Sequence, residues 1–196
     1  FKIFGRRLAV GPRPIPLWLA ASGPQTLELA GERADGVIIS AGTSPAFIGW
    51  ALDHVRTGEK RAGRAVKKAA LVLCSVSEDE RVSNDRLRRR LGYVLRGAHH
   101  ARNLELAGSK LDQTELSQAF AKEDWNSFDA LVTDDVVRRH CASGTPAQVA
   151  AMMGAYHKAG LDELVAYGMQ GSEQTAQVLA VMSPQSARES DIAIRR

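Results

Sequence analysis

The chain has 196 residues, of which 44% are hydrophobic and 24% charged; this is the composition of a folded globular domain and excludes a disordered or fibrous protein. No run approaches the roughly 18 apolar residues of a membrane-spanning helix, and no secretory leader is recognisable at the N-terminus. These features predict a cytoplasmic protein without a membrane partner.

The net charge of +4 is accompanied by a concentration of arginines between Arg81 and Arg96. No nucleic-acid-binding module is recognisable there, so we interpret the stretch as a solvated helix face and expect no nucleic acid partner. Cys74 and Cys141 lie in unrelated contexts without metal-ligand spacing, which predicts two buried free thiols.

The adjacent pair His99 and His100 does not have the pattern of a metal site. Neighbouring residues of a helix point about 100° apart, and neither a carboxylate nor a cysteine stands at ligand spacing beside the pair. We therefore predict that the chain holds no metal.

The first half of the chain alternates between strand and helix patterns. Apolar runs predict buried parallel strands over residues 16–21, 36–40 and 69–76. Ser22-Gly23-Pro24 interrupts the first run, and a helical pattern begins at Thr26. The order is therefore strand, tight loop, helix, strand.

Capping signals mark two further helices in this half. Ser44 has the position of an N-cap, with Pro45 as the first residue of a long amphipathic helix that ends near Gly63. Ser77 and Glu80 have capping-box spacing, which predicts the start of the next helical region.

The second half is helical until its last strand. Residues 85–141 show only helical periodicity. This segment is too long to be a single helical crossover between two parallel strands. Thr145, a following proline and Gln148 form a strong helix start, and a fourth strand is expected at residues 163–167. Four β/α units with right-handed crossovers predict a parallel sheet, open or closed.

Two small-residue loops follow predicted strands and are candidate ligand sites. In the loop within residues 20–26, free N–H groups at the start of a helix favour an anion such as phosphate; the alternative is a tight turn that needs glycine only for its geometry. Residues 40–44 form the second loop, which is either a ligand loop or only the cap of the next helix.

Residues 14–38 (PIPLWLAASGPQTLELAGERADGVI) closely resemble the luciferase-like monooxygenase superfamily, above all its coenzyme F420 branch. Gly144 to Val149 and Ala159 to Asp162 resemble the last helix and strand of that family. The resemblance implies a (β/α)8 TIM barrel, of which residues 1–196 are a single partial domain: strands five to eight, with a helical insertion before the last strand.

The resemblance also implies the chemistry and the binding residues. The full-length protein is expected to transfer a hydride with coenzyme F420 or FMN, as a monooxygenase or a methylenetetrahydromethanopterin reductase-like enzyme, on a small-molecule substrate that Ser40 faces. Catalytic residues are not assigned, because most groups near the reactive ring belong to the other half. The cofactor phosphate is assigned to the loop residues Ala21, Ser22, Gly23, Gln25 and Thr26.

Two other readings stay open at this point. The chain could be a small open α/β domain that binds a phosphorylated ligand, or a basic, non-enzymatic binding module built on Arg86 to Arg96. A half barrel has two unpaired strand edges, so under the preferred reading we expect an inactive fragment that self-associates as a homo-oligomer.

Overall fold

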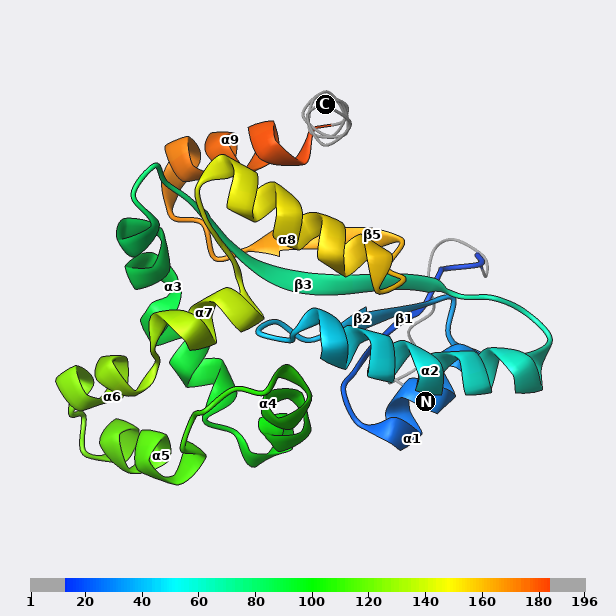
Figure 1. Cartoon of the computed structure of the whole chain (residues 1–196). Coiled ribbons are helices and arrows are strands. Elements are labelled where there is room, and N and C mark those ends of the chain that lie inside the picture. The colour runs from blue at the N-terminus through cyan, green and yellow to red at the C-terminus, as the bar shows by residue number, and fades with distance from the viewer. Residues whose placement is uncertain (1–12, 184–196) are drawn as a thin grey trace, which may run out of the picture.

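The computed structural model describes residues 13–183 as a parallel sheet with helices packed on one face and a further group of helices at the carboxyl end of its longest strand (Figure 1). The strands are β1 (Trp18–Ala21), β2 (Gly36–Ile39), β3 (Lys67–Val76), β4 (Ala142–Gly144) and β5 (Glu163–Tyr167). The helices are α1 (Pro24–Arg33), α2 (Pro45–Ala62), α3 (Glu80–Leu95), the 3-10 helix η1 (Ala98–His100), α4 (Ala101–Ala107), α5 (Gln113–Ala121), α6 (Trp125–Leu131), α7 (Asp134–His140), α8 (Pro146–Lys158) and α9 (Gly171–Met182).

The ten-residue strand β3 organises the sheet. It pairs with β2 on one side, while on the other its residues 69–73 pair with β5 and its residues 74–76 pair with β4, all in parallel. β1 pairs with β2. The four predicted strands are therefore confirmed as neighbours in sequential order, whereas β4 was not predicted, because its sequence Ala-Ser-Gly has no apolar run.

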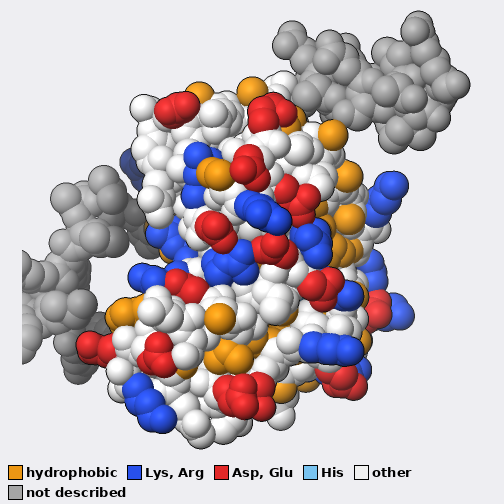
Figure 2. Space-filling model, turned by 60° about the vertical axis from the view of Figure 1, so that its left-hand side comes forward, with side chains coloured by type: hydrophobic (Ala, Val, Ile, Leu, Met, Phe, Trp, Pro, Cys, Tyr) orange, Lys and Arg blue, Asp and Glu red, His pale blue; other side chains and the backbone are white. Residues whose placement is uncertain are grey.

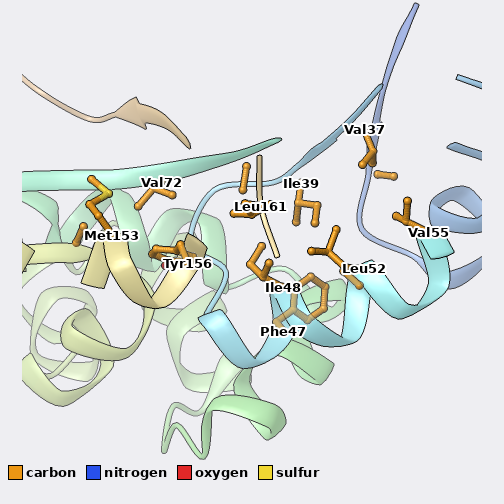
Figure 3. Close-up of a cluster of buried hydrophobic side chains, with 14 of the residues drawn as sticks. Val37, Ile39, Phe47, Ile48, Leu52, Val55, Val72, Met153, Tyr156 and Leu161 are labelled. Carbon is orange, nitrogen blue, oxygen red and sulfur yellow. The ribbon is translucent and has the colours of Figure 1, made fainter. Parts of the chain in front are cut away.

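One face of the sheet carries the larger hydrophobic core. Side chains of β2 and β3, such as Val37 and Val72, pack against α1, α2 and α8, and Figure 3 shows Ile48, Leu52 and Tyr156 reaching into this layer from α2 and α8. Full burial of each such aliphatic side chain contributes roughly 1.5–3 kcal/mol relative to exposure. Coverage of this face accounts only for alternate residues of the apolar runs. The expectation that residues 16–21 form a buried strand is wrong, because Leu17, Trp18 and Ala20 are exposed, and Val165 and Tyr167 of β5 are 42% and 45% exposed.

Helices α3 to α7 form a second core at the carboxyl end of β3. Leu73 packs there against Leu87 and Leu91 of α3, which in turn contact Phe128 of α6 and its neighbours. The helical character predicted for residues 85–141 is confirmed. This segment, called the helical segment below (residues 77–141), leaves the sheet after Val76 and returns at β4, where the Ser77 N–H donates to the Gly144 carbonyl at 3.0 Å.

The arginines of α3 are largely used within the fold. Arg88 forms ion pairs with Asp85 and Asp134, and Arg89 forms one with Asp129. The side chain of Arg88 is only 18% exposed, so the interpretation of this stretch as a solvated face is wrong at that position. Figure 2 shows acidic and basic side chains intermixed on the side of the molecule it displays.

Helix starts follow the capping predictions at two of three places. The Ser44 hydroxyl accepts from the Phe47 N–H at 3.2 Å, and Thr145 and Gln148 form a complete capping box. The prediction for Ser77 is wrong, because α3 begins two residues later than expected with Asp79 as N-cap. Among residues 13–183, no helix is both long and apolar enough to cross a membrane.

Two glycines bring α1 and α2 into direct backbone contact. A Cβ at Gly31 would lie 2.1 Å from the Val55 carbonyl oxygen, and a Cβ at Gly58 would lie 2.0 Å from the Glu28 carbonyl oxygen. Any larger residue at either position requires the helix backbones to separate. The position of α1, and with it the loop before α1, therefore depends on these two glycines.

We expect Gly58→Ala to lower the free energy of unfolding by about 3 kcal/mol, because the new methyl group meets backbone that cannot rotate away. Gly49→Ala, in the same helix, is the matched control: its Cβ meets nothing within 4 Å, so it should be neutral or stabilise by about 0.5–1 kcal/mol. Urea unfolding of the two variants measures the difference. Equal stabilities would contradict the contact.

Candidate functional site

The loop between β1 and α1 has the geometry of an anion site. Ser22 and Gly23 follow the carboxyl end of β1, and Gly23 is the N-cap of α1 with extended backbone (φ −95°, ψ 151°) and without a side-chain cap. Within the described part of the chain, the N–H groups of Gln25 and Thr26 have no acceptor. Among residues 13–183 the prediction that these two donors are free is confirmed, and free donors at a helix start attract negative charge.

Gly23 itself is not required by the fold. A Cβ at Gly23 would meet no atom within 4 Å, and its negative φ suits any residue. In addition, the first turn of α1 contains no acidic side chain that would compensate the helix dipole. Space over the backbone, free donors and an uncompensated dipole occur together, which is the arrangement that lets a phosphate approach the main chain.

The five residues assigned to the cofactor phosphate share this loop but differ in exposure. Ala21 is the last residue of β1 and is buried, Ser22 and Gly23 are half-buried, and Gln25 and Thr26 are exposed in the first turn of α1. A ligand at this loop would therefore contact the last four, with Ala21 placing the loop from below.

Ser40 lies at the same edge of the sheet. Ala21 and Ile39 are register partners of β1 and β2, so Ser22 and Ser40 are the residues that directly follow each of them. Ser40 is half-buried, and its carbonyl oxygen accepts from the Thr43 hydroxyl at 3.0 Å. The two small-residue loops thus stand side by side at the carboxyl ends of parallel strands, where α/β proteins bind ligands.

The loop that contains Ser40 is held by Asn103 of α4. The Asn103 Oδ1 atom accepts from the Ser44 N–H at 2.9 Å and from the Ser44 hydroxyl at 3.2 Å, and its Nδ2 donates to the Gly42 carbonyl at 2.8 Å. Asn103 is fully buried. The sequence offers no signal for this residue, because it stands about sixty positions from its partners in a short helix without a motif.

His140 and Tyr156 also hold the loop that contains Ser40. The His140 Nδ1 atom lies 3.0 Å from the Gly42 carbonyl oxygen and its Nε2 lies 2.7 Å from the Ser109 hydroxyl, so the neutral ring donates to the first and accepts from the second. The Tyr156 hydroxyl donates to the Thr43 carbonyl at 2.6 Å. His140 is therefore part of a buried hydrogen-bond network.

Two histidines near this loop are held neutral by burial. Desolvation lowers the pKa of His140 to about 4, and desolvation together with the neighbouring His99 and His140 lowers the pKa of His100 to about 4. Neither ring is a general base or acid matched to neutral pH. Within residues 13–183, no group of three His, Cys, Asp or Glu side chains is placed to hold a metal ion.

Cys74 and Cys141 are both buried free thiols, as the sequence predicts. Burial raises the pKa of Cys74 to about 12 and that of Cys141 well above its usual value. Since the thiolate is the nucleophile, neither cysteine is a nucleophile at neutral pH.

Comparison with known proteins decides the family. The model of the luciferase-like monooxygenase family matches residues 1–163. The chain belongs to this family. It is 31% identical over 174 residues to the 5,10-methylenetetrahydromethanopterin reductase of Archaeoglobus fulgidus, a match that covers 85% of the chain and 52% of the relative. The chain therefore spans about half the length of the curated relatives it matches.

Two solved structures have a similar fold over most of this chain. The coenzyme F420 dependent tetrahydromethanopterin reductase from Methanopyrus kandleri superposes with a TM-score of 0.74 at 26% identity, covering 85% of this chain and 49% of that one. The long-chain alkane monooxygenase LadA superposes with a TM-score of 0.56 at 16% identity, covering 88% and 41%, and supports the fold alone.

We expect the neutral histidines to make stability depend on pH between about 4 and 6.5. The unfolded chain protonates His100 and His140 near pH 6.5 while the folded chain does so only near pH 4, so the unfolded state binds more protons in this window and stability falls as the pH falls. Each histidine contributes on the order of 3 kcal/mol to the change.

Urea unfolding at several pH values between 4.5 and 7.5 measures this slope. Lowered pKa values of carboxyl groups such as Glu80 act in the same direction, but only at the acid end of the window, as the pH falls to the ordinary carboxyl value of 4.5 and below. His100→Gln should make the slope shallower, and a stability that does not change across the window would contradict the buried neutral state of both rings.

Proposed function

We propose that this chain supplies the phosphate-binding half of an F420-dependent oxidoreductase that transfers a hydride to or from a small-molecule substrate. The observation that carries the proposal is the β1–α1 loop, where free N–H groups of Gln25 and Thr26 and open space over Gly23 occur together. The deazaflavin or flavin ring supplies the hydride chemistry when bound, and the protein supplies orientation and electrostatics.

The choice of F420 over FMN follows the relatives. The structure with a TM-score of 0.74 is described as coenzyme F420 dependent, and an F420-dependent glucose-6-phosphate dehydrogenase from Nakamurella multipartita is 40% identical over 52 residues, covering 26% of this chain and 15% of that protein. Both cofactors carry a phosphate that the same loop would hold, so FMN is the second outcome of any binding test. The loop residues would bind the phosphate through main-chain donors rather than through a cation.

Ser40 is proposed to face the substrate. Its hydroxyl forms no hydrogen bond within the described part of the chain, and it stands beside Ser22 at the edge where the cofactor phosphate would lie. A half-buried hydroxyl in this position is available to orient a substrate by donating or accepting a hydrogen bond.

The sheet supports the further proposal that four more strands close a (β/α)8 barrel in the complete protein. Within residues 13–183, β1 pairs only with β2 and β5 pairs only with β3, so each leaves an edge open. Val165 and Tyr167 of β5 are 42% and 45% exposed, whereas β2 is almost fully buried. A barrel interior formed with a second half would cover these side chains.

We expect Gly23→Ala to weaken cofactor binding without weakening the fold. The methyl group meets nothing in the chain but occupies the space through which phosphate would reach the backbone, so the dissociation constant for F420 should rise about tenfold, which corresponds to about 1.4 kcal/mol. Fluorescence titration of the complete gene product with F420 and with FMN measures this. Gly154→Ala, which also meets nothing within 4 Å, is the control and should bind as the wild type does.

The outcome separates two ideas. If Gly23→Ala binds F420 and FMN with wild-type affinity, the loop does not hold the phosphate. If the wild type binds neither cofactor, the oxidoreductase proposal itself is wrong.

A second expectation concerns residues 1–196 expressed alone. Open apolar edges at β1 and β5 favour pairing between chains, so this polypeptide should self-associate or aggregate, and it should bind F420 only weakly because most of the pocket is absent. Light scattering and a fluorescence titration test both points. A stable monomer with micromolar or tighter affinity for F420 would contradict the half-barrel proposal.

A further inference from the structure

The loop between β2 and α2, residues 40–44, is bound at three main-chain groups by side chains from distant helices. The Gly42 carbonyl accepts from Asn103 and His140, the Thr43 carbonyl accepts from Tyr156, and the Ser44 N–H donates to Asn103. Asn103 and His140 belong to α4 and α7 of the helical segment, and Tyr156 belongs to α8.

The N-terminus of α2 is capped without these hydrogen bonds. The helix already has its N-cap in the Ser44 hydroxyl and a proline as its first residue. Asn103 and His140 instead join the loop to elements that follow it by 61 and 98 positions in the chain. All of the groups involved are buried, so an unmade bond would leave a polar atom without water.

The loop also has a fixed relation to α3. A Cβ at Gly42, which has φ +72°, would lie 3.2 Å from Leu91 and 3.1 Å from Val94 of that helix. The loop is thus closed in by α3 as well as by the hydrogen bonds from α4, α7 and α8. Residues 40–44 therefore have a single conformation as long as the helical segment is folded.

We infer that Asn103 and Tyr156 are positioning residues, through which the helical segment and α8 set the place of the loop that carries Ser40. The inference rests on the proposed function, in which a substrate lies at the carboxyl ends of β1 and β2. Ser40 forms none of these bonds with its side chain, so its hydroxyl stays available while its backbone is fixed two residues away at Gly42. A small displacement of such a group lowers the rate of an oriented reaction steeply.

The test compares Tyr156→Phe and Asn103→Ala with the wild type in the complete gene product. Tyr156→Phe removes one hydroxyl and little volume, so it keeps the fold even where Asn103→Ala does not. Hydrogen exchange of the peptide covering residues 38–47 reports the loop. Steady-state kinetics with 5,10-methylenetetrahydromethanopterin and reduced F420 as probes report the site.

Both variants should exchange faster in residues 38–47. They should also change kcat or KM for the methylenetetrahydromethanopterin probe by about fivefold, while KM for F420 changes less than twofold, because neither Asn103 nor Tyr156 forms a hydrogen bond with the β1–α1 loop. Ser83→Ala is the control. Ser83 is equally buried and its hydroxyl donates to the Ser75 carbonyl at 2.7 Å and accepts from the Gly144 N–H, so its loss destabilises the same region without touching the loop.

Wild-type exchange in residues 38–47 of Tyr156→Phe would overturn the inference, and so would faster exchange with unchanged kinetics. Equal kinetic effects in Ser83→Ala would also overturn it, since they would reduce the role of Tyr156 to general stability. A wild-type protein that neither binds F420 nor reduces the probe would contradict the proposed function and not this inference. In that case the hydrogen-exchange comparison alone decides whether Asn103 and Tyr156 hold the loop.

Discussion

The parallel pairing of β3 is the interaction on which the rest of the structure depends. Its ten residues hold β2 along one side and both β5 and β4 along the other, so every other strand reaches the sheet through it directly or through β2. Side chains on its two faces enter different cores, Val72 the one under α2 and α8, and Leu73 the one under α3. A single strand therefore aligns the loops at the carboxyl edge and anchors the helices that cover them.

The sequence predicts those parts of the fold that local chemistry determines. Ser44, Thr145 and Gln148 cap helices because their side chains reach donors within three residues. Buried strands are recognised in the sequence as apolar runs. β4 lacks any such pattern and is a strand only because β3 is beside it. The same limit explains why Asp79, rather than Ser77, is the N-cap of α3. Both side chains carry an acceptor, and only the path of the backbone decides which of them accepts from the first turn of the helix.

The same distinction between local and distant interactions applies to the candidate site. Free donors at Gln25 and Thr26 follow from one strand, one glycine and one proline that are contiguous in the chain, so the sequence predicts them. Asn103 and His140 approach the second loop from helices far along the chain, and an asparagine or histidine in a short helix has no pattern that reveals such a partner. Glycine illustrates both cases: Gly31 and Gly58 are explained by contacts within the chain, whereas a Cβ at Gly23 would meet no atom within 4 Å.

The hydrogen bond between Ser77 and Gly144 closes the helical segment at its base. A segment whose two ends meet at one point of the sheet can gain or lose helices without moving the strands, because loop closure becomes only slightly more costly with length. The β1–α1 loop lies on the far side of β2 from that point. Proteins built on this plan are therefore free to exchange the helices of this segment while the β1–α1 loop keeps its place in the sheet.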